Sequence, residues 1–122
     1  PSIMQRVVDN TAAAFRATAR LEYNWGCPPT INDDSVAEIA QGAVKRLYGE
    51  EGLISMPQLT GSEDFPFYTE KVPGAFAFLG VANPEKGIQW PQHHSHYDVD
   101  EDALQVGAAV YAQFALDYLA TK

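Results

Sequence analysis

The sequence predicts an α/β fold, in which helices pack against a sheet with a buried central strand. Residues 75–81, Ala-Phe-Ala-Phe-Leu-Gly-Val, are nearly all apolar, which is typical of a strand covered on both faces. Apolar residues recur at helical spacing in residues 2–18, 35–48 and 100–120, before and after that strand. Together these patterns favour helices layered on a sheet over an all-helical or all-β fold.

The N-terminal part reads as a helix followed by a strand. Ser2 is expected to cap a helix over 2–18, with Gln5 as its capping-box partner. Residues 19–25 then alternate apolar and polar side chains, which predicts a strand with one buried face. This strand has no upstream partner, so the pair resembles the second half of a larger helix-and-sheet unit.

A break at Pro28-Pro29 predicts a domain boundary near residues 28–32, because consecutive prolines cannot continue a central strand. Ser35 and Glu38 then form a second expected capping box, and Gly49 is the expected C-terminal cap of the helix. Residues 53–60 are expected to be irregular or a short strand. The last helix, over about 100–120, is apolar almost all round and is expected to be a buried core helix.

Composition limits the classes of function. The 122 residues are 46% hydrophobic and 20% charged, as in an ordinary globular protein. The net charge of −8 argues against nucleic acid or an anionic membrane as partner. Cys27 is the only cysteine, which excludes an internal disulfide and indicates a reducing, cytoplasmic compartment. The chain begins at Pro1, which is compatible with a processed product, an excised domain or a proteolytic remnant.

All three histidines lie in the run His93-His94-Ser95-His96, between a loop and the start of the last helix. Histidine is the commonest metal ligand, and loops beyond strand ends are where open α/β folds bind ligands. One cluster cannot complete a metal site, which usually needs three or four protein ligands from separate places. The alternative is structural, with one histidine buried and hydrogen-bonded and the other two solvated.

Two further polar segments are candidates for a binding site. Gly61-Ser62-Glu63-Asp64 precedes an aromatic cluster and could line a pocket, although these residue types also make simple turns. Asn32 lies at the expected hinge between domains, where pockets often form, while Asp33 and Asp34 are expected to serve only as helix-start acids. Nothing near Cys27 provides the electropositive setting that a catalytic thiol needs.

Three segments in combination resemble the C-terminal end of the M20 metallopeptidase family. They are Gly61–Phe65, the stretch Val72-Pro73-Gly74 through Gly80, and His93 through Leu104. The nearest resemblance is to the amidohydrolase branch, which includes hippurate hydrolases, N-acyl-amino-acid amidohydrolases and auxin-conjugate hydrolases. The resemblance spans nearly the whole chain, and the exit Tyr23–Asn32 with its Pro-Pro also resembles the family's exit from its lid domain.

The resemblance implies a two-domain enzyme with a three-layer α/β catalytic domain and a smaller α+β lid domain that usually makes a homodimer. Residues 1–29 would be the end of the lid, and residues 30–122 the C-terminal part of the catalytic domain. Two divalent metals per active site are implied, zinc or manganese and possibly cobalt or nickel. The implied substrate is an N-acyl amino acid or a small peptide, cleaved at an amide bond by amidohydrolase or carboxypeptidase activity.

The resemblance also implies roles for residues. The family's C-terminal metal ligand lies eight residues before the Glu of an Asp-Glu pair, which corresponds to His93 counted from Glu101, with His94 as the alternative. Gly61, Ser62, Glu63 and Asp64 would line the substrate pocket. Ser95 stands where the family usually has proline, which puts the shape of the loop in question.

The family's other metal ligands, its general-base glutamate and its lid histidine lie upstream of the matched region, so no catalytic residue is expected in this chain. The first hypothesis is therefore a C-terminal segment of a metal-dependent amidohydrolase that is inactive when isolated. The second is a non-catalytic binding or oligomerisation module with a vestigial metallopeptidase fold.

Overall fold

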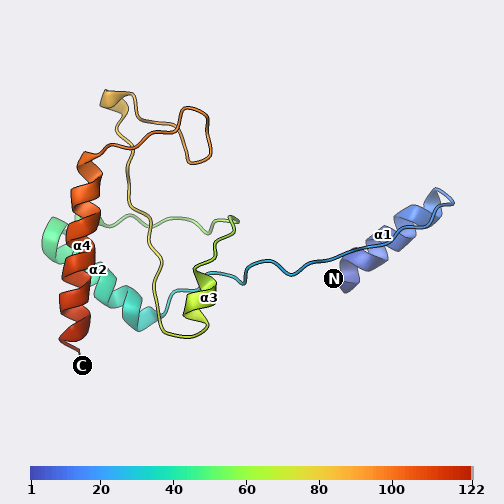
Figure 1. Ribbon diagram of the computed structural model, residues 1–122, viewed down its shortest axis with the longest axis horizontal. Coiled ribbons are helices and arrows are strands. Elements are labelled where there is room, and N and C mark those ends of the chain that lie inside the picture. Colours follow the sequence, from blue (N-terminus) through green and yellow to red (C-terminus); the bar gives the residue numbers. More distant parts are fainter. Residues whose placement is uncertain (122) are drawn as a thin grey trace.

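The computed structural model describes residues 1–121, and its regular elements are helices (Figure 1). They are α1 (Ser2–Ala14), α2 (Asp34–Tyr48), η1 (Glu50–Gly52), α3 (Pro66–Thr69), η2 (Pro84–Lys86) and α4 (Asp102–Leu119). Helices α2 and α4 pack against each other, whereas α1 lies apart at the end of an extended segment. None of the helices in the described part combines the length and hydropathy needed to cross a bilayer.

Helix α1 ends four residues earlier than expected, because the chain turns at Arg16. Arg16 adopts a left-handed backbone with φ of 53°, and the amide of Ala17 donates to the carbonyl of Ala12 at 2.9 Å. Together with the bond from Arg16 N to Ala13 O, this is the Schellman pattern that terminates helices. The expected capping box is also wrong: Pro1 is the N-cap residue, and the Gln5 side chain donates to Asp9.

Helix α2 begins at an aspartate rather than at the expected serine cap. Asp33 is the N-cap, and its carboxylate accepts a hydrogen bond from the amide of Val36 at 3.1 Å. Ser35 donates its hydroxyl to the same carboxylate, so the predicted Ser35–Glu38 box is wrong. The predicted cap at the other end is confirmed, since Gly49 ends the helix with φ of 76°.

The packed core lies between α2 and α4. Val36 and Ala43 of α2 are its buried apolar residues, and Arg46 reaches Asp117 of α4 at 3.5 Å. Gly107 lets Leu79 approach α4 closely, because a Cβ at this position would lie 2.9 Å from Leu79 Cδ2. The small side chains at these contacts let the helices and the 74–81 segment come together.

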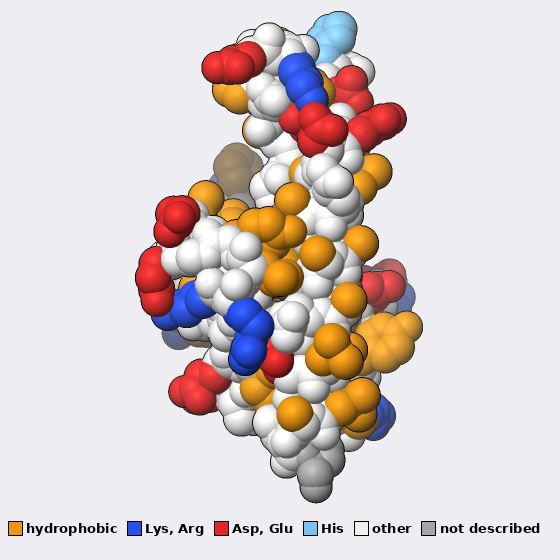
Figure 2. Space-filling model, turned by 90° about the vertical axis from the view of Figure 1, so that its left-hand side faces the viewer, with side chains coloured by type: hydrophobic (Ala, Val, Ile, Leu, Met, Phe, Trp, Pro, Cys, Tyr) orange, Lys and Arg blue, Asp and Glu red, His pale blue; other side chains and the backbone are white. Residues whose placement is uncertain are grey.

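The expectation that α4 is a buried core helix is wrong for the described residues. No residue of α4 is buried, and Tyr111 is 80% exposed. Within residues 1–121, α2 packs along α4 and Leu79 lies against Gly107, and these contacts leave every residue of an almost wholly apolar helix at least partly exposed. Figure 2 shows hydrophobic side chains spread over the face where α2 and α4 lie.

The two predicted strands, 19–25 and 75–81, do not form, so the α/β expectation is not met within residues 1–121. A strand needs a neighbour with free backbone groups, and the described chain brings no second strand beside either segment. The only β-type pairing recorded there is an isolated antiparallel bridge between Asn83 and Ile88. Residues 53–60 are irregular after Gly52, as one of the two sequence expectations had it.

The 74–81 segment is instead anchored at both ends. At its start, Gly74 O accepts a hydrogen bond from Asp33 N at 2.9 Å. At its end, Val81 O accepts a hydrogen bond from Asp100 N at 2.9 Å. These bonds tie the segment to the beginnings of α2 and α4.

Glycine substitutions test this packing. Gly42 lies inside α2 with open space around it, so Gly42→Ala should raise the free energy of unfolding by about 0.5–1 kcal/mol. Gly107→Ala should gain less, because the new methyl group must displace Leu79. Urea unfolding followed by circular dichroism measures both. Equal gains at the two positions would contradict the close packing of Leu79 on α4.

Candidate functional site

The histidine run lies in a loop whose two ends are joined. On one side, Asn83 and Ile88 pair through both backbone bonds, at 2.7 and 3.0 Å, and enclose the η2 turn. Asn83 also caps η2, accepting from the amide of Glu85 at 3.2 Å. On the other side, Asp100 precedes α4. Residues 89–99 therefore run between two fixed points.

Four polar side chains close the base of the loop, and we call them the clasp: Asn83, Lys86, Asp100 and Asp102. Lys86 Nζ donates to Asp100 Oδ1 and to Asp102 Oδ2, both at 2.6 Å. Asn83 Nδ2 donates to the other oxygen of Asp100, also at 2.6 Å. The Asp100 side chain is only 14% exposed, so its charge is screened less than that of a surface pair.

Contacts within the clasp shift the pKa values of Asp100 and Lys86. The hydrogen bond from Lys86, followed by that from Asn83, holds the pKa of Asp100 below its ordinary value. The two carboxylates raise the pKa of Lys86, with Asp100 the larger cause. Each shift favours the charged form, so Asp100 and Lys86 are both ionised around neutral pH.

His93 differs from its neighbours in backbone and surroundings. Its φ of 68° puts it in the left-handed region, which costs about 1–2 kcal/mol for a residue with a Cβ. Its side chain is exposed, and within residues 1–121 it has no hydrogen bond, ion pair or ring contact. Strained backbone clusters at functional sites, so the exposed His93 is a candidate functional residue.

His94, in contrast, is engaged in the loop itself. Its ring stacks on Trp90 with centroids 4.1 Å apart and planes 6° apart, and its Nδ1 accepts from the amide of His96 at 3.1 Å. Its backbone amide donates to Pro91 O, and its carbonyl accepts from Tyr97 N. These contacts leave Nε2 as the only ring nitrogen of His94 without a recorded bond.

The polar loop Gly61–Asp64 is exposed and leads into α3. The carbonyl of Asp64 accepts from the amide of Phe67 at 3.1 Å, and Phe65 packs on Phe76 with ring centroids 5.3 Å apart. Ser62 and Glu63 are exposed to solvent. The loop is thus held at its C-terminal end by an aromatic contact with the 74–81 segment.

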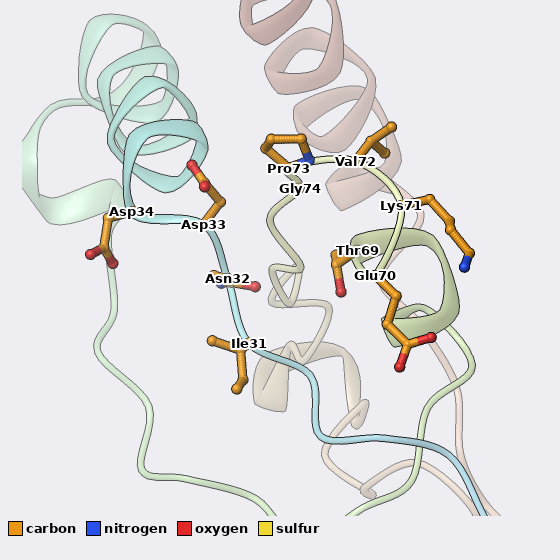
Figure 3. A pocket seen from close by; sticks show the side chains of 10 residues that line it. All are labelled: Ile31, Asn32, Asp33, Asp34, Thr69, Glu70, Lys71, Val72, Pro73 and Gly74. Atoms are coloured by element: carbon orange, nitrogen blue, oxygen red, sulfur yellow. The ribbon is translucent and has the colours of Figure 1, made fainter.

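Asn32 lies where an open cavity of about 560 Å³ separates the start of α2 from the turn after α3 (Figure 3). Its side-chain amide pairs with the backbone of Phe76: Nδ2 donates to Phe76 O at 3.0 Å, and Phe76 N donates to Oδ1 at 2.8 Å. Glu70 and Lys71 lie across the cavity. The Gly61–Asp64 loop does not line this cavity.

The described residues do not bring the predicted site residues together into one metal centre. Within residues 1–121, no group of three or more His, Cys, Asp or Glu side chains could hold a metal ion. An imidazole without a partner nevertheless suits zinc, cobalt or nickel as one ligand of a larger set. His93 fits a divalent metal as a single donor, and the remaining donors would have to come from outside these residues.

Sequence reasoning missed the clasp. None of its four residues was predicted as part of a site from the sequence. The Asn83-Pro84 dipeptide and Gly87 signal a turn here, but pairing across the loop cannot be read from local pattern. Cys27 is an exposed free thiol.

Comparison with known proteins identifies the family. The profile described as Peptidase family M20/M25/M40 matches residues 2–117. The chain is 42% identical, over 98% of its length, to IAA-amino acid hydrolase ILR1-like 6 of Arabidopsis thaliana, of which it covers 26%. It is 33% identical, over 99% of its length, to N-acetylcysteine deacetylase of Bacillus subtilis, of which it covers 30%.

A third relative is archaeal. The chain is 31% identical, over 94% of its length, to thermostable carboxypeptidase 1 of Saccharolobus solfataricus, of which it covers 29%. The chain belongs to the M20 family of peptidases and hydrolases, which confirms the resemblance seen in its motifs. It spans less than a third of the length of these three relatives.

The ionised clasp predicts a pH dependence of stability. Because the folded-state pKa of Asp100 is lowered, its contribution is present above the unfolded value of about 4 and is lost as pH falls below it. Because that of Lys86 is raised, its contribution is present below about pH 10 and is lost as pH rises further. Asp100→Asn should therefore reduce the free energy of unfolding by a constant amount between these limits.

The measurement is urea unfolding of both proteins from about pH 3, where free carboxylates are mostly protonated, to about pH 9, where they are ionised. The difference between Asp100→Asn and the unchanged protein should shrink as pH falls below about 4, because Asp100 is protonated there in the unfolded state before it is protonated in the folded state. A difference that persists unchanged at pH 3 would rule out an ionised Asp100 as its source.

Proposed function

We propose that this chain is the C-terminal part of a metal-dependent amidohydrolase that cleaves the amide bond of N-acyl amino acids or small peptides. The observation that carries the proposal is His93, a free imidazole on a left-handed backbone in a chain of the M20 family. The relatives support the substrate class, since their names describe hydrolysis of an amino-acid conjugate, an N-acetyl amino acid and a peptide.

His93 is proposed to hold one of two divalent metals, zinc or manganese and alternatively cobalt or nickel. Its lack of a partner within the described residues favours it over His94, whose ring is occupied by Trp90 and the amide of His96. The chemistry that such metals supply is polarisation of the scissile carbonyl and activation of water. The other ligands and the general base would lie in the larger protein, so the isolated 122 residues are expected to be inactive.

The substrate pocket is proposed to include Gly61, Ser62, Glu63 and Asp64. These residues are exposed in a loop that Phe65 fixes against Phe76, which leaves Ser62 and Glu63 free to meet a ligand. Asn32 is proposed to border the same pocket from the domain boundary. Because its amide is paired with Phe76, it would act mainly by fixing the backbone there.

Residues 1–29 are proposed to end the lid domain of the larger enzyme, and residues 30–122 to belong to its α/β catalytic domain. The separation of α1 from the rest of the chain supports this division. Exposed apolar side chains on α1, including Ile3 and Val7, support a homodimer through the lid. We also propose a cytoplasmic location, because Cys27 is a free and exposed thiol.

The second candidate is a non-catalytic binding or oligomerisation module. The extent of exposed apolar surface favours it: Leu104, Leu116 and Leu119 of α4 are all more than half exposed. Such a surface requires a partner, whether another part of the same protein or another molecule. This module would need no bound metal, so metal content separates the two candidates.

Replacement of His93 tests the first candidate. In the protein expressed from the complete coding sequence, His93→Ala should weaken binding of one metal by more than about 100-fold, since loss of outer-shell partners alone costs 10–100-fold. Hydrolysis of N-acetyl amino acids should fall with it. The readouts are metal content by mass spectrometry and amino-acid release.

His96→Ala is the matched control, because His96 is an exposed histidine of the same run whose ring nitrogens have no recorded bond. It should keep both metals and most of the activity. Full metal content in His93→Ala would remove the ligand assignment. Absence of metal from the unchanged protein would favour the non-catalytic module.

A further inference from the structure

The clasp joins residues that are 14 to 17 positions apart in the sequence at the base of the histidine loop. Lys86 lies in η2, and its two carboxylate partners lie at the start of α4. Figure 1 shows η2 and the loop beyond the N-terminal end of α4. In Figure 2 acidic and basic side chains gather at this end of the molecule, close to a histidine.

A single ammonium group donates hydrogen bonds to both carboxylates. Asp100 and Asp102 are two residues apart and both direct oxygens to Lys86 Nζ at 2.6 Å, so without the lysine they would repel each other. Asn83 completes the contact, because it bonds the second oxygen of Asp100 and also caps η2. The loop ends are therefore held by charge-assisted bonds in addition to the backbone pairs.

The clasp affects His93 because it fixes the two ends of the loop that contains His93. Residues 89–99 contain no helix or strand, and the recorded bonds inside them are short-range: His94 to Pro91, Tyr97 to His94 and the His96 amide to the His94 ring. A left-handed backbone at His93 persists only if the surroundings determine it. The Trp90–His94 stack fixes one side of the run, and the clasp fixes the distance between the loop ends.

We propose that Lys86 is a positioning residue for the metal site, and that it acts through Asp100 and Asp102 to hold the loop that presents His93. The proposal rests on the proposed function, because it takes His93 as a metal ligand. Ligands must be held within about 0.5 Å of the productive geometry, so a loosened loop base should weaken metal binding even though Lys86 touches no metal.

The experiment compares variants of the protein expressed from the complete coding sequence. Lys86→Met removes the charge and keeps the length of the side chain, and Lys86→Arg keeps the charge. Lys45→Met is the matched control, because Lys45 has a similar exposure and pairs with one carboxylate, Glu50, at 2.9 Å between the last turn of α2 and η1, outside the clasp. Each apoprotein is titrated with Co²⁺ alone against a chelator, and the visible absorption of bound Co²⁺ and the thermal midpoint are recorded.

Lys86→Met should weaken the more affected Co²⁺ site by about tenfold, the scale of outer-shell effects on metal affinity, and should change its absorption spectrum. Lys86→Arg should restore affinity to within about threefold, and Lys45→Met should bind as the unchanged protein does. A loss of affinity in Lys45→Met equal to that in Lys86→Met would overturn the proposal, as would a failure of arginine to restore binding.

His93→Ala, titrated in parallel, distinguishes a failure of the clasp proposal from a failure of the assignment of His93 as a metal ligand. If it loses a Co²⁺ site while Lys86→Met binds normally, the clasp proposal is wrong and the ligand assignment stands. If His93→Ala binds Co²⁺ unchanged, the ligand assignment itself fails. Should Lys86→Met not fold, Asp102→Ala takes its place, since it removes one partner and keeps Lys86 on Asp100; unchanged Co²⁺ affinity in that variant overturns the proposal.

Discussion

The structure depends on how the apolar segment 74–81 satisfies its backbone groups without a neighbouring strand. Asn32 supplies a side-chain amide whose donor and acceptor match those of Phe76, in the way that a partner strand would. Asp33 and Asp100 supply backbone amides at the two ends of the segment. Because these donors lie at the starts of α2 and α4, the same bonds that satisfy the segment also position both helices.

The hydrogen bond at the end of this segment also fixes the end of the histidine loop. Val81 and Asp100 are joined by a backbone bond, and the clasp side chains lie just inside this junction. Asp100 takes part in the backbone bond and in the clasp: its amide donates to Val81 O, and its carboxylate accepts from Lys86 and Asn83. Helix α4, the 74–81 segment and the loop thus meet at one residue, and the geometry of the loop is coupled to the packing of α4 against α2.

Local patterns predicted the helices better than their ends or their surroundings. The stripe in residues 35–48 and the apolar run in 100–120 correspond to α2 and α4 within two residues, because helical periodicity is a short-range signal. The capping boxes failed because Pro1 and Asp33 took the cap positions, and the strands failed because strand formation depends on a distant partner. The histidine run identified a candidate loop, but neither the clasp nor the free state of His93 is visible in residue order.

The three histidines show why residue type predicts chemistry more readily than role. In the sequence they are nearly equivalent, but the loop commits the His94 ring to Trp90 and its Nδ1 to the amide of His96. His93 instead carries a left-handed backbone and an unengaged ring. Local strain of this kind is stable only when other contacts outweigh it. The Trp90–His94 stack on one side and the clasp at the base are among the contacts that hold the loop, so the exposed position of the His93 ring depends on residues outside His93 itself.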